Sequence, residues 1–462
     1  MAGSAGRRRL RPRYGHAASR LTVQPVVFGI ELSRAQRTGT SNLTRINLCI
    51  CRSPIIEAFD TFDEFSMTIS SSFPPLMIRG RALLPIVQGG MGIGISAHRL
   101  AGSVAREGAL GTIASIDLRH HHADLLERCR ANPVRDTFDA ANLEALRREI
   151  SRARTWSEGR GMIAVNVMKA VRAHADYVRV SCEAGADAIV MGAGLPLDLP
   201  DMTEGHDIAL IPILSDSRGI ALVLKKWMKK GRLPDAIVIE HPAHAGGHLG
   251  VGNVEEMHDA RFSFARVLEE ASEAIRTLGL ARESIPLIVA GGINSHEAVR
   301  AALALGANGV QLGTPFAVTE EGDAHPAFKH VLTHAQPEDI VEFVSVTGLP
   351  ARAVRTPWLD RYLRHEARIR AKLGAFRQRC PTAFECLSVC GLRDGVERFG
   401  HFCIDTRLAA ALRGDVANGL FFRGREALPF GEAIRSVRDL LALLLTGAAP
   451  EAATNRPMFS LA

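Results

Sequence analysis

The amino-acid sequence predicts an α/β protein whose main domain is a (β/α)8 TIM barrel, with a helical insertion and a mainly helical C-terminal extension. From Leu83 onward, eight short apolar runs alternate with longer amphipathic stretches, which is the pattern of repeated βα units around a parallel sheet. Several runs end in paired glycines, at the edge where a barrel presents its functional loops. An open doubly wound sheet is the alternative, because a strand count taken from sequence can err by one or two.

Each expected strand is a short apolar run that ends at turn-forming or polar residues. The runs are Leu84–Gln88, Leu110–Ala114, Met162–Val167, Ala188–Met191, Ile208–Leu214, Ala236–Ile239, Leu287–Ala290 and Val310–Leu312. Helical patterns between them cover Ala97–Glu107, Ala173–Ala184, Arg218–Lys230, Phe264–Leu278 and Ser295–Leu305. Ser295 is expected to cap the start of the last of these helices, and Gly306 to end it.

Three regions follow from this pattern. Residues 1–66 lack a sustained period and are left out of the fold. Their Arg-rich, acid-poor composition resembles an organellar transit peptide, whereas an unordered extension or a start of translation at Met67 are the favoured alternatives. The barrel is expected over 67–335, with 119–156 as an inserted helical hairpin over its open end. Residues 336–462 form the C-terminal extension, which is expected to pack on the barrel as lid or dimer surface.

The formal net charge of +7 belongs to the N-terminal segment. Residues 1–52 hold ten arginines, no lysine and one acidic residue, Glu31, which leaves 46 basic and 48 acidic residues for the remainder. A nearly neutral body is not expected to bind nucleic acid, which requires a basic face. The sequence has no apolar stretch of the roughly 18 residues that a membrane span requires. Without a secretory signal pattern, the expected location is the cytoplasm.

Glycine-rich ends of three predicted strands indicate a phosphate site. The first strand ends in Gln88-Gly89-Gly90-Met91, the seventh in Gly291-Gly292, and the eighth in Gly313-Thr314. Loops after the seventh and eighth strands of a barrel commonly bind phosphate through backbone N–H groups. The sequence therefore predicts a mononucleotide phosphate at Gly291, Gly292, Gly313 and Thr314.

The stretch Ala236–Gly250 places histidines beside paired glycines at a strand end. Gly246 and Gly247 allow close approach of the backbone to a flat or anionic ligand, and a neighbouring histidine is suited to moving a proton near neutral pH. His241, His244 and His248 also have a spacing seen in metal sites, but Pro242 and the glycines favour a loop. Solvated or ligand-facing histidines are therefore expected here instead of a metal.

The segments PIVQGGMG, AVNVM, GADAIVMGAG, AGGHLG, PLIVAGGI and GVQLGTPF occur in this order between Leu83 and Leu332. In these segments the chain resembles the nitronate monooxygenase family, formerly called 2-nitropropane dioxygenases, and the related flavin-dependent enoyl-acyl-carrier-protein reductases. The resemblance implies an oxidoreductase that binds FMN non-covalently in a TIM barrel. It places Gln88, Gly89, Gly90 and Met91 along the isoalloxazine ring, Asn166 on the ring or ribityl chain, and Gly246 and Gly247 facing the flavin.

The resemblance also assigns the catalytic histidine to His248. As a general base it would remove the α-proton of a nitroalkane, after which O2 completes oxidation to a carbonyl compound and nitrite. One alternative is a reductase that uses NAD(P)H to reduce an enoyl thioester or a quinone. A second alternative, from another class, is a non-flavin barrel that binds a phosphorylated ligand. The expected partners are a small-molecule substrate and O2, with NAD(P)H and a homodimer as further expectations.

Four late cysteines have the spacing C-x5-C-x3-C-x12-C: Cys380, Cys386, Cys390 and Cys403. Their number suits a Zn²⁺ ion or an Fe–S cluster, but their spacing matches neither common pattern. Buried reduced thiols are the alternative. A metal at these cysteines is thus a hypothesis that the structure can address.

Overall fold

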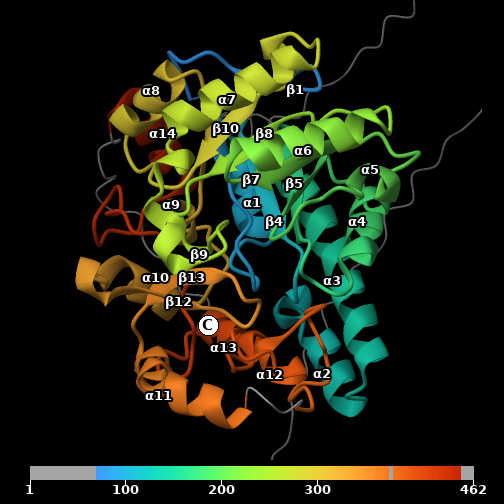
Figure 1. Cartoon of the computed structure of the whole chain (residues 1–462), viewed down its shortest axis with the longest axis vertical. Helices are drawn as coiled ribbons and strands as arrows, with labels where there is room; N and C mark the ends of the chain where they lie inside the picture. The colour runs from blue at the N-terminus through green and yellow to red at the C-terminus, as the bar shows by residue number, and fades with distance from the viewer. Residues whose placement is uncertain (1–68, 374–377, 449–462) are drawn as a thin grey trace, which may run out of the picture. The chain divides into compact units, whose positions relative to one another are not determined.

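The computed structural model describes residues 69–373 and 378–448 (Figure 1). Eight parallel strands close into a barrel in the order β10-β11-β3-β4-β5-β6-β7-β8, which confirms the predicted TIM barrel over the open sheet. The strands are β3 (Ile86–Gln88), β4 (Leu110–Ala114), β5 (Met162–Met168), β6 (Ala188–Gly192), β7 (Ala209–Leu214), β8 (Ile237–Glu240), β10 (Leu287–Ala290) and β11 (Gly309–Leu312).

The strands are apolar throughout because both of their faces are buried. In β8, Val238 packs inside the barrel, whereas Ile237 and Ile239 pack outward in the cluster that includes the helices. Successive side chains of a strand point to opposite faces, so a strand buried on both sides lacks the alternation of polar residues. This is why the strand positions could be located from sequence.

An outer ring of helices covers the barrel, as Figure 1 shows. It contains α1 (His98–Arg106), α3 (Arg135–Trp156), α4 (His174–Glu183), α6 (Ser217–Met228), α7 (Phe264–Thr277) and α8 (His296–Ala304), with short α5 (Leu199–Met202) and α9 (Thr314–Ala317). The Ser295 hydroxyl accepts a hydrogen bond from the Ala298 N–H at 3.2 Å, and Gly306 follows α8 with a φ of +99°, as expected for its cap and stop. The last described helix, α14 (Val437–Thr446), packs against α8 and α1 and so belongs to the ring.

A short antiparallel hairpin precedes the barrel, in β1 (Leu76–Ile78) and β2 (Arg81–Leu83). Leu76, Ile78 and Leu83 are buried in one cluster with barrel-interior residues such as Leu110. The hairpin therefore adds to the interior core. Periodicity did not reveal it, because each of its strands has only three residues.

The segment 119–156 forms helices, as expected: η1 (Leu118–His121), α2 (Ala123–Ala131) and α3. Helix α3 packs against α1 and α4 through a buried face that includes Ala141, Ala145 and Ile150. Small residues on that face permit close packing in the outer ring.

The C-terminal extension is mainly helical, but it also contains a β-hairpin that the sequence analysis missed. Helix α10 (Pro326–His334) precedes the extension. Its own helices are α11 (Pro357–Leu373), α12 (Gly391–Asp394), α13 (Ile404–Leu412) and α14, and its strands are β12 (Ile340–Val344) and β13 (Pro350–Val354). Strand β13 pairs with β9 (Gly247–His248), so the extension joins the predicted catalytic loop in one antiparallel sheet. In the described ranges we found no helix with the length and apolar character of a membrane span.

Candidate active site

A cavity of about 280 Å³ opens at the carboxyl ends of the barrel strands. It collects the predicted site residues from widely separated parts of the chain. Those that line it are Gly89, Gly90, Met91, Asn166, Gly246, Gly247, His248, Gly291, Gly292, Gly313 and Thr314. The closed barrel explains this convergence, because all eight strand ends meet at one rim.

Gln88 is the predicted residue that does not line the cavity. Its side chain is fully buried, its Oε1 accepts from the Thr112 N–H at 2.8 Å, and its Nε2 donates to the Thr112 carbonyl at 3.1 Å. The amide therefore joins β3 to β4 inside the barrel, where its hydrogen-bonding groups are used.

Three glycine positions show why a side chain is excluded here. A Cβ on Gly90 would lie 2.3 Å from the Asn166 Cβ, so the loop after β3 touches the Asn166 side chain. Gly291 and Gly292 have φ values of +96° and +83°, which favour glycine. Within the described part of the chain, their backbone N–H groups have no hydrogen-bond acceptor. Such groups beside a cavity suit a bound phosphate.

His248 is held at the cavity by the C-terminal extension. Its Nε2 lies 2.8 Å from the Ser345 Oγ, its backbone pairs with Ala351 in β13, and its ring contacts Phe422 edge-on at 5.6 Å. Burial lowers the pKa of His248 to about 4. The imidazole is therefore neutral at pH 7, the state that a general base requires.

Arg352 fixes the loop that precedes His248. Its side chain is fully buried; it donates to the carbonyls of Pro242 and Ala245 and forms an ion pair with Glu342 at 2.8 Å. The Arg352 backbone is also the partner of Gly247 across the β13–β9 ladder. One residue thus fixes both ends of the short segment between Pro242 and Gly247.

The extension also supplies a wall of the cavity that the sequence analysis did not anticipate. Its lining residues are Leu408, Ala411, Leu420, Phe422, Arg423, Gly424, Glu426, Ala427 and Leu428, and Phe328 of the preceding helix α10 also lines the cavity. The Gly424 N–H donates to the Thr314 Oγ1 at 2.9 Å, and a Cβ on Gly246 would lie 2.6 Å from the Arg423 backbone. Gly246 therefore faces this wall. No repeating pattern marks residues 420–428, so composition alone could not place them.

Comparison with known proteins now connects this geometry to a family. The nitronate monooxygenase family profile matches residues 79–446, which is most of the chain. This chain belongs to the nitronate monooxygenase family. The family is one of oxidoreductases, so the predicted enzyme class is confirmed. A probable nitronate monooxygenase from Bacillus subtilis (strain 168) is 26% identical over 294 residues, covering 60% of this chain and 78% of that protein.

Two solved structures share the fold. FabK from Thermotoga maritima superimposes with a TM-score of 0.56 at 23% identity, covering 78% of this chain and 91% of that one. A nitroalkane oxidase from Streptomyces ansochromogenes gives a TM-score of 0.52 at 21% identity, covering 78% of this chain and 95% of that one. At these low sequence identities, the similarity shows a shared fold and nothing further.

Within this family member, Glu240 is a lining residue that the sequence analysis did not select. It ends β8, and burial raises the pKa of its carboxyl group to about 7, while nearby Arg352 acts in the opposite direction. A perturbed carboxyl group in a cavity is a candidate for function. The available signal was its position, since a polar residue at the end of an apolar barrel strand faces the functional rim.

We expect Glu240 to make anion binding depend on pH. Below pH 7 the carboxyl group is protonated and neutral, and above pH 7 its negative charge repels an anion in the cavity. Nitrate, a small anion at every working pH, is therefore expected to bind in the cavity and to compete with other ligands there. Its inhibition constant should rise by roughly 3- to 30-fold as pH passes upward through about 7. The variant Glu240→Gln should show a flat profile; an unchanged slope in that variant would contradict the assignment.

The other histidines of the loop do not form a metal set. His244 Nδ1 pairs with the Glu426 carboxylate at 2.7 Å, and His241 Nδ1 accepts from the Ala243 N–H at 3.2 Å. Burial, and secondarily His244, lower the pKa of His241 to about 4. His244 also lines the cavity.

The four late cysteines do not support the predicted metal centre. Cys380, Cys386, Cys390 and Cys403 are free thiols, and none belongs to the group of potential ligands that the described residues bring together. Burial raises the pKa of Cys386, Cys390 and Cys403, which favours protonated thiols. The hydrophobic clusters that contain Cys386 and Cys390 show them used for packing.

Proposed function

We propose that this chain binds FMN in the cavity and oxidises nitronates with O2, and that it accepts nitroalkanes because His248 removes their α-proton. The observation that carries the proposal is the position of His248. It is held by Ser345 and β13 on the cavity that also contains the glycine-rich ends of β3, β10 and β11.

The glycine positions fit a flavin mononucleotide. Side chains at Gly291 and Gly292 would lie 3.0 Å from the His241 carbonyl oxygen and 3.1 Å from the His244 ring, so this part of the rim has room only for backbone. Gly291, Gly292, Gly313 and Thr314 would hold the phosphate, and Gly89, Gly90, Met91 and Asn166 would lie along the ring system. FMN supplies the transfer of electrons between the substrate and O2.

The protein side of the chemistry is a proton transfer. We assign the tautomer in which Nε2–H donates to Ser345 Oγ, so that the neutral His248 ring has its lone pair on Nδ1, an atom that makes no hydrogen bond within the described residues. Nδ1 is therefore the atom that takes the α-proton of a nitroalkane. The apolar side chains of Leu408, Leu420 and Phe422 line the same cavity and exclude water from this transfer.

The overall reaction balances without a further reductant. Two nitronate anions and one O2 give two carbonyl compounds and two nitrite ions. In each nitronate the C=N bond breaks and a C=O bond forms, so carbon is oxidised and O2 is reduced. A preformed nitronate needs no proton removal, so the loss of His248 should reduce nitroalkane turnover more than nitronate turnover.

One set of assays on the purified full chain tests the proposal. We expect absorbance at about 450 nm from bound flavin, and O2 consumption with nitrite release from nitroethane or propionate-3-nitronate without NADH. A flavoprotein that is inert to nitronates but is rapidly bleached by NADH without O2 would instead favour a reductase of an enoyl thioester or quinone. A colourless protein that gains no flavin absorbance when FMN is added would favour a non-flavin barrel. The use of NAD(P)H, a homodimer and a cytoplasmic location remain predictions.

A further inference from the structure

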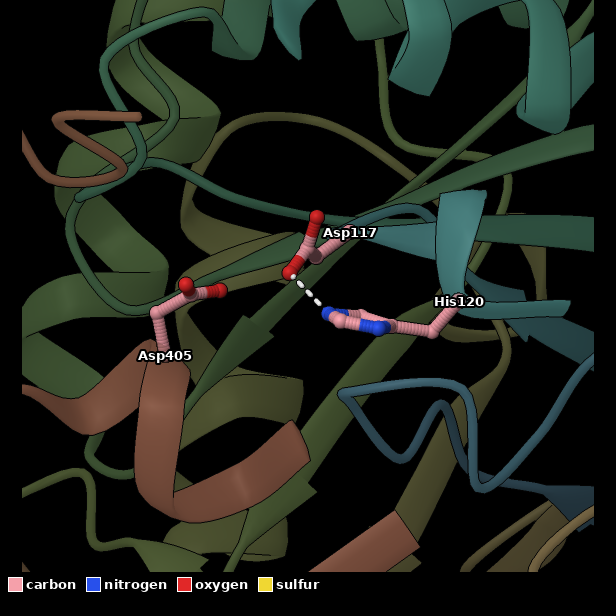
Figure 2. A group of neighbouring side chains, drawn as sticks. All are labelled: Asp117, His120 and Asp405. Carbon is pink, nitrogen blue, oxygen red and sulfur yellow. Dashed lines mark hydrogen bonds and ion pairs between the residues drawn. The ribbon is translucent and has the colours of Figure 1, made fainter. Parts of the chain in front are cut away.

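Behind one wall of the cavity lies a buried polar cluster made of Asp117, His120 and Asp405. One ligand atom from each of the three side chains lies within 4.8 Å of the others. The Asp117 Oδ2 and the His120 Nε2 are 3.0 Å apart. Figure 2 shows the Asp405 carboxylate directed toward the Asp117 oxygen that contacts His120. The cluster joins the loop after β4 to helix α13.

Asp405 is buried in this cluster without a full set of hydrogen bonds. The residue is 3% exposed, and its Oδ1 has no hydrogen-bond partner. A buried carboxylate is strongly destabilising unless it is paired, protonated or bound to a cation. Asp117, which is 0% exposed, also has an Oδ1 without a hydrogen bond. Asp117 has a charged partner, because its Oδ1 forms an ion pair with Arg119, whereas Asp405 is left without a direct one.

Arg119 compensates only part of the negative charge of the cluster. Its guanidinium forms an ion pair with the Asp117 Oδ1 and is held between the rings of Phe138 and Phe384, at 4.7 and 5.0 Å from the ring centroids. The Asp117 Oδ2 faces His120 instead. With a neutral imidazole, the two carboxylates and the Arg119 guanidinium leave a formal charge of −1 inside the buried cluster. The next cation, Arg413, is exposed and acts on Asp405 electrostatically without forming an ion pair with it among the described residues.

We propose that Asp117, His120 and Asp405 bind a divalent transition-metal cation, with Mn²⁺ as the best match. Two carboxylates and one imidazole combine the oxygen ligands that suit Mn²⁺ with a nitrogen that first-row metals accept. Two ligand atoms about 2.1 Å from one ion and at a right angle lie about 3 Å apart. The spacing between Asp117 and His120 has this value.

The position of the site gives the ion a structural role. Ile116, which precedes Asp117, and Leu408, three residues after Asp405 in α13, both line the cavity. An ion between the two aspartates would join the barrel rim to the helix that forms the wall of the cavity. The proposal does not depend on the reaction that the cavity performs.

The test uses the full chain, stripped with a chelator, and MnCl2 alone as the probe. Mn²⁺ is chosen because the sulfur groups of the four cysteines would prefer softer metals. We expect about one bound Mn²⁺ per chain by electron paramagnetic resonance, and a Tm that rises by about 2–4 °C when Mn²⁺ is added. Asp405→Asn and His120→Gln should each lower Mn²⁺ affinity at least about tenfold, whereas the exposed Asp415→Asn should bind as the parent does.

Other outcomes overturn the proposal. Negligible Mn²⁺ binding by the parent chain would mean that the cluster needs no cation, as when one carboxyl group carries a proton. Equal binding by the parent and by Asp405→Asn or His120→Gln would place the ion elsewhere. If Asp405→Asn does not fold, the His120→Gln comparison decides, because His120 lies at the partly exposed side of the cluster.

Discussion

Replacing His248 with alanine is expected to lower kcat/KM for nitroethane by about 10²- to 10⁴-fold, the usual contribution of a general base. The loss with preformed ethyl nitronate is expected to be less than about tenfold, because that substrate has already lost its α-proton. The measurement is the rate of O2 consumption with the two forms of the same substrate. The ratio of the two losses isolates the proton transfer from any general damage to the cavity.

The exposed His258→Ala variant is the matched control, because it removes an imidazole from the same loop region without touching the cavity. Flavin content, measured by absorbance, should be equal in parent and variants. An equal loss with nitroethane and its nitronate would contradict the role of His248 as base and would indicate that it positions the substrate. The pKa of His248 is lowered to about 4, so its imidazole stays deprotonated from neutral pH down to about that value. We therefore expect the rate of nitroethane turnover to persist over this pH range.

Replacing Arg352 with methionine is expected to lower the free energy of unfolding by about 3–5 kcal/mol. The variant leaves the Pro242 and Ala245 carbonyls and the Glu342 carboxylate without their buried partner. For nitroethane, the substitution should lower kcat more than it changes KM, because the loop that is no longer fixed carries His248. Chemical denaturation and steady-state kinetics on the same preparation measure both effects.

Arg352→Lys should be intermediate, because an ammonium group keeps the charge but not the planar set of donors. Arg361→Met provides the control: Arg361 is exposed and donates to the Ala417 carbonyl at 3.3 Å. We expect that control to change the free energy of unfolding by less than about 0.5 kcal/mol. A similarly small change for Arg352→Met, with unaltered turnover, would show that the loop holds its conformation without the arginine.

Much of the barrel was predictable because its signals are local. The apolar runs of β5 and β8 and the capping residue Ser295 depend on neighbours within a few positions. The glycine-rich strand ends were equally visible, because a barrel brings all strand ends to one rim whatever the intervening sequence. Gln88 was misplaced for a local reason as well: from the strand pattern alone, its amide could face either the rim or the neighbouring strand β4.

The C-terminal contribution to the cavity could not be predicted in the same way. Phe422 and Gly424 reach the cavity only because β13 pairs with β9, and that pairing joins residues about a hundred positions apart. Asp405 lies near Asp117 for the same kind of reason, through packing of α13 on the loop after β4. The expected cover of the open end by residues 119–156 stays a prediction, although the buried face of α3 packs in the outer ring.

By itself, the sequence determined the eightfold βα rhythm, the glycine-rich rim and the histidine that faces it, because period and turn chemistry act over short distances. Only the tertiary structure decided what surrounds that histidine: the hydroxyl of Ser345, the guanidinium of Arg352 and the carboxyl group of Glu240 with its raised pKa. Burial and contacts between distant segments set these properties, and neither is encoded in the spacing of residues along the chain.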